Sequence, residues 1–317
     1  MTFLGVNAAL IQQYIEFKRN LGYLMKRPCV LKMFDRFTIK NGINTIGLTR
    51  ELAEKWAEKR PNESKRNRYS RINVIINFSA YLNQLGYDSY IPKKPKPCRS
   101  TFTPYIFSLS ELQAFFYAAD TTIVHKNSTM KYILPIIFRL IYSCGLRADE
   151  ALSLKCADVC LDKQYIIIGN AKNGQDRILP LSDSITEICS LYQEKYLKRY
   201  SKNDYFFHQK NKMKYKTNSL YNWFRKVLWK SGISHGGRGL GPRVHDLRHS
   251  FSVHALHSMS QQGLDLYYSL PILSKYLGHR SLKATDQYVR LTSEMFPELI
   301  RDVDKNCTNV FPEVDEL

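Results

Sequence analysis

The sequence predicts a mainly α-helical protein of two domains: a four-helix N-terminal domain, then a mixed α+β, mostly helical domain with a small antiparallel sheet. Three observations predict this class. Apolar residues recur at helical spacing along most of the chain. A segment of alternating prolines and lysines interrupts that pattern near residue 95, and two β-type runs flank an Asn-Gly dipeptide at 173–174. The 317 residues, 44% of them hydrophobic, suffice for two ordinary domains with a real core.

Residues 1–90 form the predicted N-terminal helical domain. Gly42 is a stop signal after the second helix, Thr49 can cap the third, and Pro61 follows the third. Short loops between helices favour a compact all-α domain. The expected helices cover residues 6–23, 30–41, 50–59 and 65–85.

Residues 91–105 are the predicted linker, because prolines that alternate with lysines stiffen a segment and remove backbone donors. The second domain then covers 106–317. Its expected strands are 165–169 and 177–181, joined by a turn that holds the Asn-Gly dipeptide. Its expected helices cover 111–119, 132–143, 150–154, 184–199, 217–231, 244–258, 270–277 and 282–290.

The charge of the chain favours a polyanionic partner. The net charge is +19, from 47 basic and 28 acidic residues. Residues 1–100 hold 19 of the basic and 7 of the acidic residues, so the first third is the more densely basic part. Nucleic acid is the commonest polyanion, although a generic basic surface and a plain spacer remain alternatives. The residues expected to contact phosphates are Lys65, Arg66, Arg68, Arg71, Lys93, Lys94 and Lys96.

Other classes are disfavoured. The sequence holds no run of 18 apolar residues, and its first residues lack the basic and apolar regions of a secretion signal. Its seven cysteines form no CxxC pair and no zinc-ligand spacing, so we expect reduced thiols in a cytoplasmic protein, and no metal site.

A group of residues suited to attack on a phosphodiester stands in the second domain. It combines a potential nucleophile with cationic and proton-donating side chains, and its acidic residues share no recognisable metal-ligand spacing. Taken alone, each member has an ordinary explanation: an arginine at a helix end, a solvated lysine in a turn, or one of 21 tyrosines. In chain order the members are Arg147, Lys172, His245, Arg248, His279 and Tyr288.

This ordered set resembles the catalytic signature of the tyrosine recombinases over roughly residues 106–300. The resemblance implies that Tyr288 attacks the phosphorus and forms a 3′-phosphotyrosyl intermediate, with no cofactor, metal or ATP. It implies that Lys172 is the general acid for the leaving 5′ oxygen, with Lys163 as an alternative. Arg147, His245, Arg248 and His279 would surround the phosphate. Glu150 and His249, which also match the motifs, would have supporting roles.

The resemblance also implies partners. Residues 1–90 would be a core-binding domain that clamps double-stranded DNA together with the catalytic domain. The chain would be a monomer alone and a homo-tetramer on two DNA sites, with residues 296–317 docked on a neighbouring protomer. The alternative is that this segment folds back on its own domain. Accessory recombinases or directionality factors could take part. Residues 270–279 resemble a transposon or integrase subgroup. A bacterial-type, nucleoid-associated protein is expected.

Two alternatives stand beside this interpretation. One is a type IB topoisomerase-like enzyme, which shares the chemistry but relaxes supercoils. The other is a non-catalytic DNA-binding regulator on the same fold.

Overall fold

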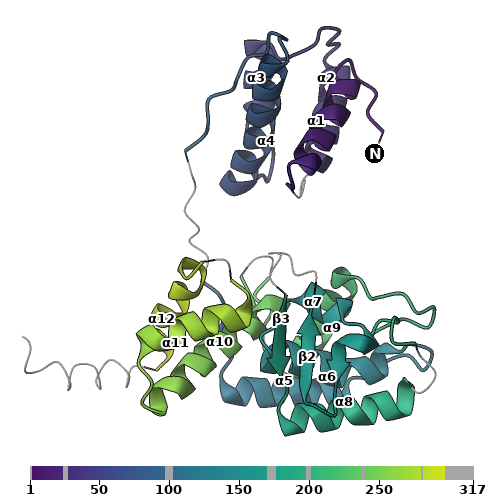
Figure 1. The fold of residues 1–317 in the computed structure, drawn as a ribbon, viewed down its shortest axis with the longest axis vertical. Helices are drawn as coiled ribbons and strands as arrows, with labels where there is room; N and C mark the ends of the chain where they lie inside the picture. Colours follow the sequence, from purple (N-terminus) through teal and green to yellow (C-terminus); the bar gives the residue numbers. More distant parts are fainter. Residues whose placement is uncertain are drawn as a thin grey trace, which may run out of the picture. The chain divides into compact units, whose positions relative to one another are not determined.

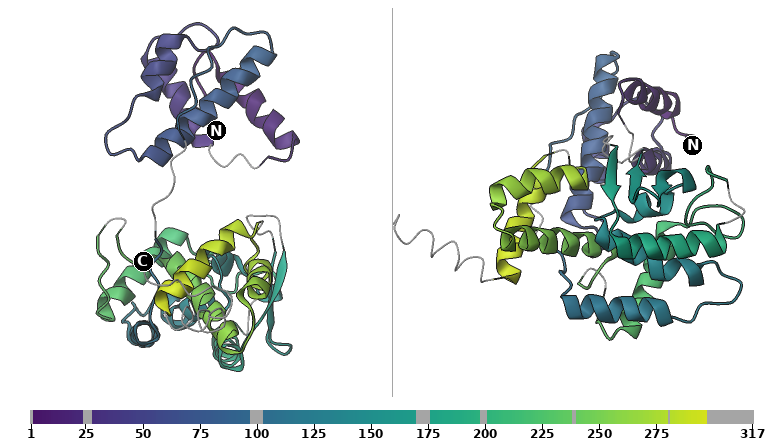
Figure 2. Two further views of the ribbon diagram at one scale, coloured as in Figure 1. Left: turned by 90° about the vertical axis from the view of Figure 1, so that its left-hand side faces the viewer. Right: turned by 60° about the horizontal axis from the view of Figure 1, so that its bottom comes forward.

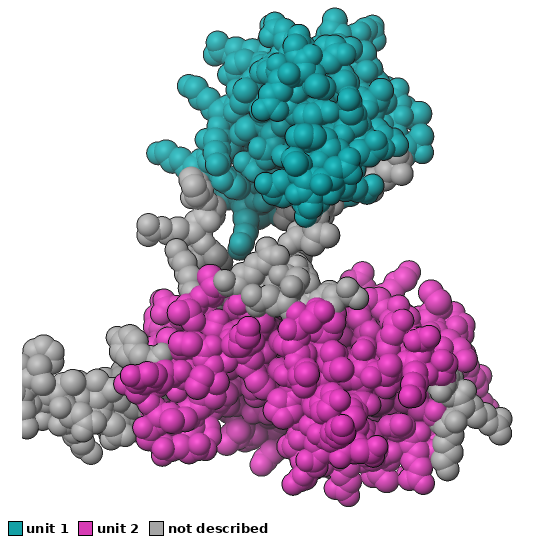
Figure 3. All heavy atoms as spheres, in the orientation of Figure 1, with its two compact units in different colours: residues 1–102 teal, residues 103–317 magenta. Residues whose placement is uncertain are grey.

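The computed structural model describes residues 2–23, 28–96, 103–169, 176–197, 201–237, 240–279 and 281–296. The chain divides into two compact units, residues 1–102 and residues 103–317, which Figure 3 shows in different colours. The division falls within the 91–105 segment expected to be a linker.

The described part of the first unit is a bundle in which α4 packs against the other three helices. The Ser64 side chain accepts a hydrogen bond from the amide of Asn67, which fixes where α4 begins, and Thr49 caps α3 in the same way. Phe34, Trp56 and Phe78 are fully buried between the helices. The helices are α1 (Ala8–Asn20), α2 (Pro28–Lys40), α3 (Arg50–Ala57) and α4 (Lys65–Gln84) (Figure 1).

The second unit is mostly helical with one small sheet, so the predicted fold class is confirmed. Its helices are α5 (Leu109–Thr121), α6 (Met130–Ser143), α7 (Ala148–Ser153), α8 (Asp183–Tyr196), α9 (Thr217–Lys230), α10 (Val244–Gln261), α11 (Leu266–Leu277) and α12 (Lys283–Met295). A 3-10 turn, Cys156–Asp158, precedes the strands β1 (Val159–Cys160), β2 (Tyr165–Ile168) and β3 (Arg177–Pro180).

The sheet is antiparallel in the order β1-β2-β3. Ile166 and Leu179 are paired and buried, whereas Ile178 is exposed, as expected for a sheet with one covered face. Strand β1 was not predicted, because two residues are too few to show an alternating pattern. The register places Arg177 opposite Ile168 at the end of the ladder.

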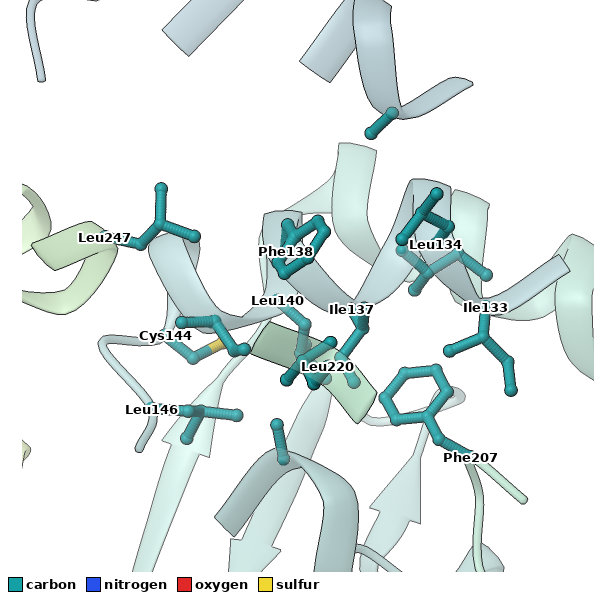
Figure 4. Packing of buried hydrophobic residues seen from close by; sticks show 14 of the residues in the cluster. Ile133, Leu134, Ile137, Phe138, Leu140, Cys144, Leu146, Phe207, Leu220 and Leu247 are labelled. Atoms are coloured by element: carbon teal, nitrogen blue, oxygen red, sulfur yellow. The ribbon is translucent and has the colours of Figure 1, made fainter. Parts of the chain in front are cut away.

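Helix α6 lies in the middle of the main core and packs against α5, α8 and α10. Figure 4 shows Ile133, Ile137 and Phe138 of α6 among the surrounding apolar side chains. The chain leaves α6 through Gly145, which has φ +56°. A Cβ there would lie 2.7 Å from the Phe251 ring, so glycine meets both the backbone and the space requirement. This turn delivers Arg147 to the start of α7.

Helices α10, α11 and α12 pack on one another around a smaller apolar cluster that includes Val253, Leu256, Leu273 and Leu291. The three helices appear together in green to yellow in Figures 1 and 2. Their packing brings the start of α10, the end of α11 and the middle of α12 close together. Helix α11 begins four residues before the predicted start at 270 and contains Pro271, because packing of Leu270 and Leu273 overrides the proline signal.

Two further observations concern the described residues alone. No helix among them is both long and apolar enough to cross a bilayer. The cysteines at 29, 144, 156, 160 and 189 are free thiols.

Candidate active site

Glu150 is the centre of the site's charged groups. It stands in the first turn of α7, where its Oε2 accepts a hydrogen bond from the Arg147 amide at 3.0 Å. Its Oε1 lies 2.6 Å from Arg147 Nη1. The short spacing Arg147-x-x-Glu150 makes both contacts possible, because Arg147 is the N-cap of α7 and a glutamate three residues on can reach back to the N-cap backbone amide. The pair fixes Arg147 at the beginning of the helix.

Two more arginines approach the same carboxylate from distant parts of the chain. Arg177 Nη2 lies 2.8 Å from Glu150 Oε2, and Arg248 Nη1 lies 3.8 Å from it. Burial alone would raise the pKa of Glu150, but hydrogen bonds from Arg177 and Arg147 lower it to about 2. Three guanidinium groups therefore face one carboxylate, which leaves an excess of two positive charges.

Arg248 is buried at the junction of three segments. It donates from Nη1 to the Gly145 carbonyl at 2.7 Å and from Nη2 to the Leu277 carbonyl at 2.7 Å. Its Nη2 also lies 3.0 Å from His279 Nε2. Desolvation and the charge of Arg147 lower the pKa of Arg248 to about 10, so it remains a cation at pH 7. Arg248 thus joins the ends of α6 and α11 to α10.

His279 follows α11 and connects it to α12. Its Nε2 faces the Arg248 guanidinium, which can only donate, so we assign the proton to Nδ1. That proton points to Thr285 Oγ1 at 2.9 Å. Desolvation and the charges of Arg248 and Arg147 lower the pKa of His279 to about 4, so the ring is neutral at pH 7.

Tyr288 lies inside this arrangement. Its hydroxyl is 2.8 Å from His249 Nδ1, and its ring stacks near His279 with 6.4 Å between the ring centroids. Burial raises the pKa of Tyr288, and the charge of Arg248 opposes that rise. Burial and the neighbouring His245 lower the pKa of His249 to about 3. His249 is therefore a neutral partner for the tyrosine hydroxyl.

His245 is the accessible member of the group. Its side chain is exposed at the start of α10, and its ring centroid lies 4.7 Å from that of His249. Desolvation by the surrounding protein and the charges of Arg248 and Arg147 lower the pKa of His245. His245 and Arg248 were predicted to share one face of a helix. In the structure the His245 imidazole is exposed, whereas the Arg248 guanidinium is buried.

A pocket of about 680 Å³ opens beside Arg147 and Glu150, and Ile168 and Tyr205 also line it. Arg147 is the most accessible arginine of the cluster, with 20% of its side chain exposed, against 7% for Arg177 and 1% for Arg248. The positive charge of the cluster is thus presented to solvent mainly through Arg147.

The structure brings together five of the six residues in the predicted catalytic set, with Glu150 and His249. The sixth, Lys172, lies outside the described residues, as do residues 297–317. Arg177 was not predicted from the sequence. The only indication in the sequence is weak, namely that Arg177 is the first residue of a mostly apolar strand. Within the described ranges, no three His, Cys, Asp or Glu side chains gather as a metal-binding group.

Arg71 corrects one sequence-based expectation. It was expected to contact phosphates, but it is only 3% exposed. Its guanidinium pairs with Glu63 at 2.7 Å and donates to the carbonyls of Trp56 and Glu58. Arg71 holds the end of α3 against α4 and has no free donor face for DNA.

The remaining basic residues in that set differ in accessibility. Arg68 is half-buried and donates from Nε to the Ala57 carbonyl at 2.8 Å. The exposed members are Lys65, Arg66, Lys93, Lys94 and Lys96.

The lowered pKa of His249 predicts a loss of stability in mild acid. An unfolded histidine titrates near 6.5, whereas the pKa of His249 in the folded chain is about 3. Between these values the unfolded chain takes up a proton that the folded chain excludes. The stabilisation is complete above pH 6.5 and is lost as the pH falls. From pH 7.5 to 5.0, His249 should remove about 2 kcal/mol from the free energy of unfolding.

Urea unfolding at both pH values would measure this loss in the wild type and in His249→Asn, whose amide can replace the Nδ1 contact. The wild type should lose about 2 kcal/mol more than the variant over this interval. Equal losses would contradict a neutral, buried His249.

With the fold and the site described, comparison with known proteins identifies the class. The phage integrase family matches residues 108–295, which is more than half of the chain. The chain belongs to the phage integrase family. Its relatives include a putative integrase/recombinase, y4rB, of Sinorhizobium fredii, 27% identical over 93% of this chain and 96% of that protein. The tyrosine recombinase XerA of Pyrococcus horikoshii is 30% identical over 72% of each chain. The prediction of a tyrosine recombinase is confirmed.

Solved structures share the fold at low sequence identity. One is a lambda integrase dimer bound to a COC′ core site, with 14% identity, 88% of this chain and 94% of that chain covered, and a TM-score of 0.62. Another is the XerH site-specific recombinase bound to difH substrate in a pre-cleavage complex, with 18% identity, coverage of 90% and 81%, and a TM-score of 0.60. The Tn1549 transposon integrase with transposon right end DNA has 14% identity, coverage of 93% and 100%, and a TM-score of 0.61.

Proposed function

We propose that this site-specific DNA recombinase cuts one strand by direct attack of the Tyr288 hydroxyl on a phosphodiester. The product is a 3′-phosphotyrosyl bond and a free 5′ hydroxyl. The observation that carries the proposal is the contact network around Tyr288. His249 is hydrogen-bonded to the Tyr288 hydroxyl. The His279 ring lies beside the Tyr288 ring and is hydrogen-bonded to Arg248.

The charged cluster suits the transition state of this reaction. Attack adds negative charge to the nonbridging oxygens of a pentacoordinate phosphorus, and fixed cations aimed at that charge lower the barrier. Three arginines against one glutamate supply such a field. Arg147 is the accessible cation and has a planar fork that matches two phosphate oxygens. Exposed His245 can donate one further hydrogen bond to the same phosphate.

We assign the Tyr288 proton to His249, whose pKa of about 3 in the free chain would rise beside the negatively charged scissile phosphate. As a neutral imidazole it can accept the hydroxyl proton at Nδ1 while the phenolic oxygen forms its bond to phosphorus. Tyr288 is only 1% exposed in the described arrangement. Cleavage therefore requires that DNA binding move α12 or the side chains that cover the hydroxyl.

The leaving 5′ oxygen needs a proton as its bond to phosphorus breaks. The resemblance to tyrosine recombinases assigns that proton to Lys172. A flexible ammonium suits the role once its pKa falls. A phosphotyrosyl ester conserves the energy of the phosphodiester, so a 5′ hydroxyl can reseal the strand without ATP.

This chemistry should need no divalent metal ion. A DNA duplex with a nick close to the cleavage point would trap the covalent intermediate, because the short leaving strand diffuses away. The wild type should form this adduct equally fast in magnesium and in excess EDTA. Adduct formation that is lost in EDTA and restored by magnesium would refute the proposed role of the arginines.

Basic residues outside the site would hold the double-stranded DNA. Phosphate contacts are open to the exposed side chains of Lys65, Arg66, Lys93, Lys94 and Lys96. Arg68 uses its Nε to bind the Ala57 carbonyl, and its other N–H groups can still donate to phosphate. Arg71 is left out of this set for the reason given above. These residues would position the duplex without selecting its sequence.

Recombination also requires assembly. We propose a homo-tetramer on two DNA sites, as the resemblance to tyrosine recombinases implies. The expected connecting segment 296–317 is shortened to 297–317, because Phe296 stacks on His257 of its own chain with 3.6 Å between the ring centroids. A type IB topoisomerase-like enzyme would act as a monomer. Synapsis of two labelled duplexes by the wild type would favour the recombinase. A chain truncated after Phe296, which keeps all of α12, should still bind single sites but lose synapsis.

A further inference from the structure

Arg177 contributes to the positive charge of the site, but no specific role has been given to it so far. It opens β3 at the end of the sheet, opposite Ile168 of β2. Its side chain is 7% exposed, so its charge has been removed almost entirely from water. Burial of a guanidinium is costly unless its partners compensate, which makes its contacts informative.

Arg177 holds Glu150 from both carboxylate oxygens. Its Nη2 lies 2.8 Å from Oε2 and its Nη1 lies 3.4 Å from Oε1. Arg147 uses the same oxygens, through Nη1 to Oε1 and through its amide to Oε2. The carboxylate is thus shared between an accessible arginine and a buried one.

This sharing has an electrostatic consequence for Arg147. A carboxylate that served Arg147 alone would neutralise it and weaken its attraction for a phosphate. Arg177 restores a positive charge without competing for the phosphate, because its own side chain is buried. On the basis of the proposed function, we propose that Arg177 is a positioning residue that keeps Arg147 fixed and its charge available to the scissile phosphate.

A second contact ties Arg177 to the opposite side of the site. The backbone of Gly278, with φ +65°, passes so close that a Cβ there would lie 3.1 Å from Arg177 Nη1 and 3.3 Å from its Cδ. Gly278 directly precedes His279, so the guanidinium supports the loop that delivers this histidine to Arg248.

The buried contacts do not satisfy Arg177 completely. Its Nε is buried and finds no hydrogen-bond partner among the described residues. A buried donor without a partner costs stability. Arg177 is therefore poorly explained as a purely stabilising residue, which favours a role in the function of the site.

The first test compares Arg177→Met with Arg139→Met. Arg139 on α6 also donates two hydrogen bonds to one carboxylate, that of Asp120 on α5. This pair is partly exposed. Arg177→Met should form covalent adduct on the nicked duplex about 10- to 100-fold more slowly, because a slightly misplaced group is enough for such a loss. DNA affinity should stay near that of the wild type, and urea unfolding measured in parallel should show a stability loss, because Glu150 loses a buried partner. The rate is therefore compared under conditions where both variants are fully folded. Arg139→Met should cleave like the wild type, and an equally fast Arg177→Met would overturn the inference.

The second test asks whether Arg177 acts through Arg147 and the phosphate charge. In a methylphosphonate substrate, one charged nonbridging oxygen of the scissile group is replaced by a methyl group. The transition state then needs less positive charge, so the loss caused by Arg177→Met should shrink to a few-fold. A loss as large as with ordinary DNA would show that Arg177 supports only the fold.

The third test uses the shared carboxylate. In a Glu150→Gln background there is no negative charge to share, so adding Arg177→Met should have much less effect on the rate than it has alone. Equal effects in both backgrounds would contradict charge sharing. The wild-type chain tests the proposed function separately. If it forms no adduct, both the proposed function and the role of Arg177 are wrong. If it cleaves and Arg177→Met cleaves equally fast, only the role of Arg177 is wrong.

Discussion

Replacement of Tyr288 by phenylalanine is expected to reduce adduct formation on a nicked duplex by at least roughly 10⁴-fold, because the variant has no nucleophile. The ring still fills its buried place between His249 and His279. Loss of the hydroxyl removes the 2.8 Å contact with His249, which should lower the free energy of unfolding by only about 1 kcal/mol. Affinity for duplex DNA should be unchanged.

Tyr276→Phe is the matched control. Tyr276 is also partly buried in the α10–α12 cluster, where its ring stacks on Phe251 with 5.5 Å between centroids. This variant should form adduct at the wild-type rate. Undiminished trapping by Tyr288→Phe, or loss of trapping in Tyr276→Phe, would assign the nucleophile to another residue.

Replacement of Arg248 by methionine should damage both the fold and the reaction. The change leaves the carbonyls of Gly145 and Leu277 without their buried donor and takes the partner from His279 Nε2. Breaking a buried, hydrogen-bonded charge arrangement costs about 3–5 kcal/mol of unfolding free energy. Cleavage should fall on the order of 10²- to 10³-fold through loss of transition-state stabilisation.

Urea unfolding and adduct formation, measured in parallel, would separate the two effects. Arg248→Lys keeps a cation but cannot reach all three acceptors at once, so it should recover part of the stability and little of the rate. Arg139→Met removes a partly exposed ion pair and should cost only about 0.2–1 kcal/mol. An Arg248→Met variant as stable as Arg139→Met would contradict the role of Arg248 as the junction of three segments.

The sequence predicted the residue types of the site but not their contacts. Arg147 is the N-cap of α7 and Glu150 is three residues on, so their pairing follows from the local geometry of a helix start. Arg177 is 27 residues from Glu150, and its pairing depends on how the sheet packs near α7, for which the sequence holds no local signal. The contact between His249 and Tyr288 likewise depends on the packing of α10 against α12.

The Arg71 expectation failed for a reason that the sequence does contain. The basic run from residue 65 to residue 71 was treated as one surface, but a helix turns through nearly two full turns over that length. Arg71 falls in the same stripe as Ile75, Phe78 and Leu82, which are all buried. Its position relative to those residues predicts burial, while Lys65 and Arg66 point to solvent.

If Tyr288 is the nucleophile, its hydroxyl becomes covalently joined to DNA during cleavage. The most direct measurement is mass spectrometry of the trapped wild-type adduct after digestion with a nuclease and a protease. The nucleotide should be attached through a 3′-phosphate to the peptide that contains Tyr288, and fragmentation should place it on that residue. A nucleotide on any other residue, or cleaved DNA without a protein adduct, would contradict the role of Tyr288 as the nucleophile.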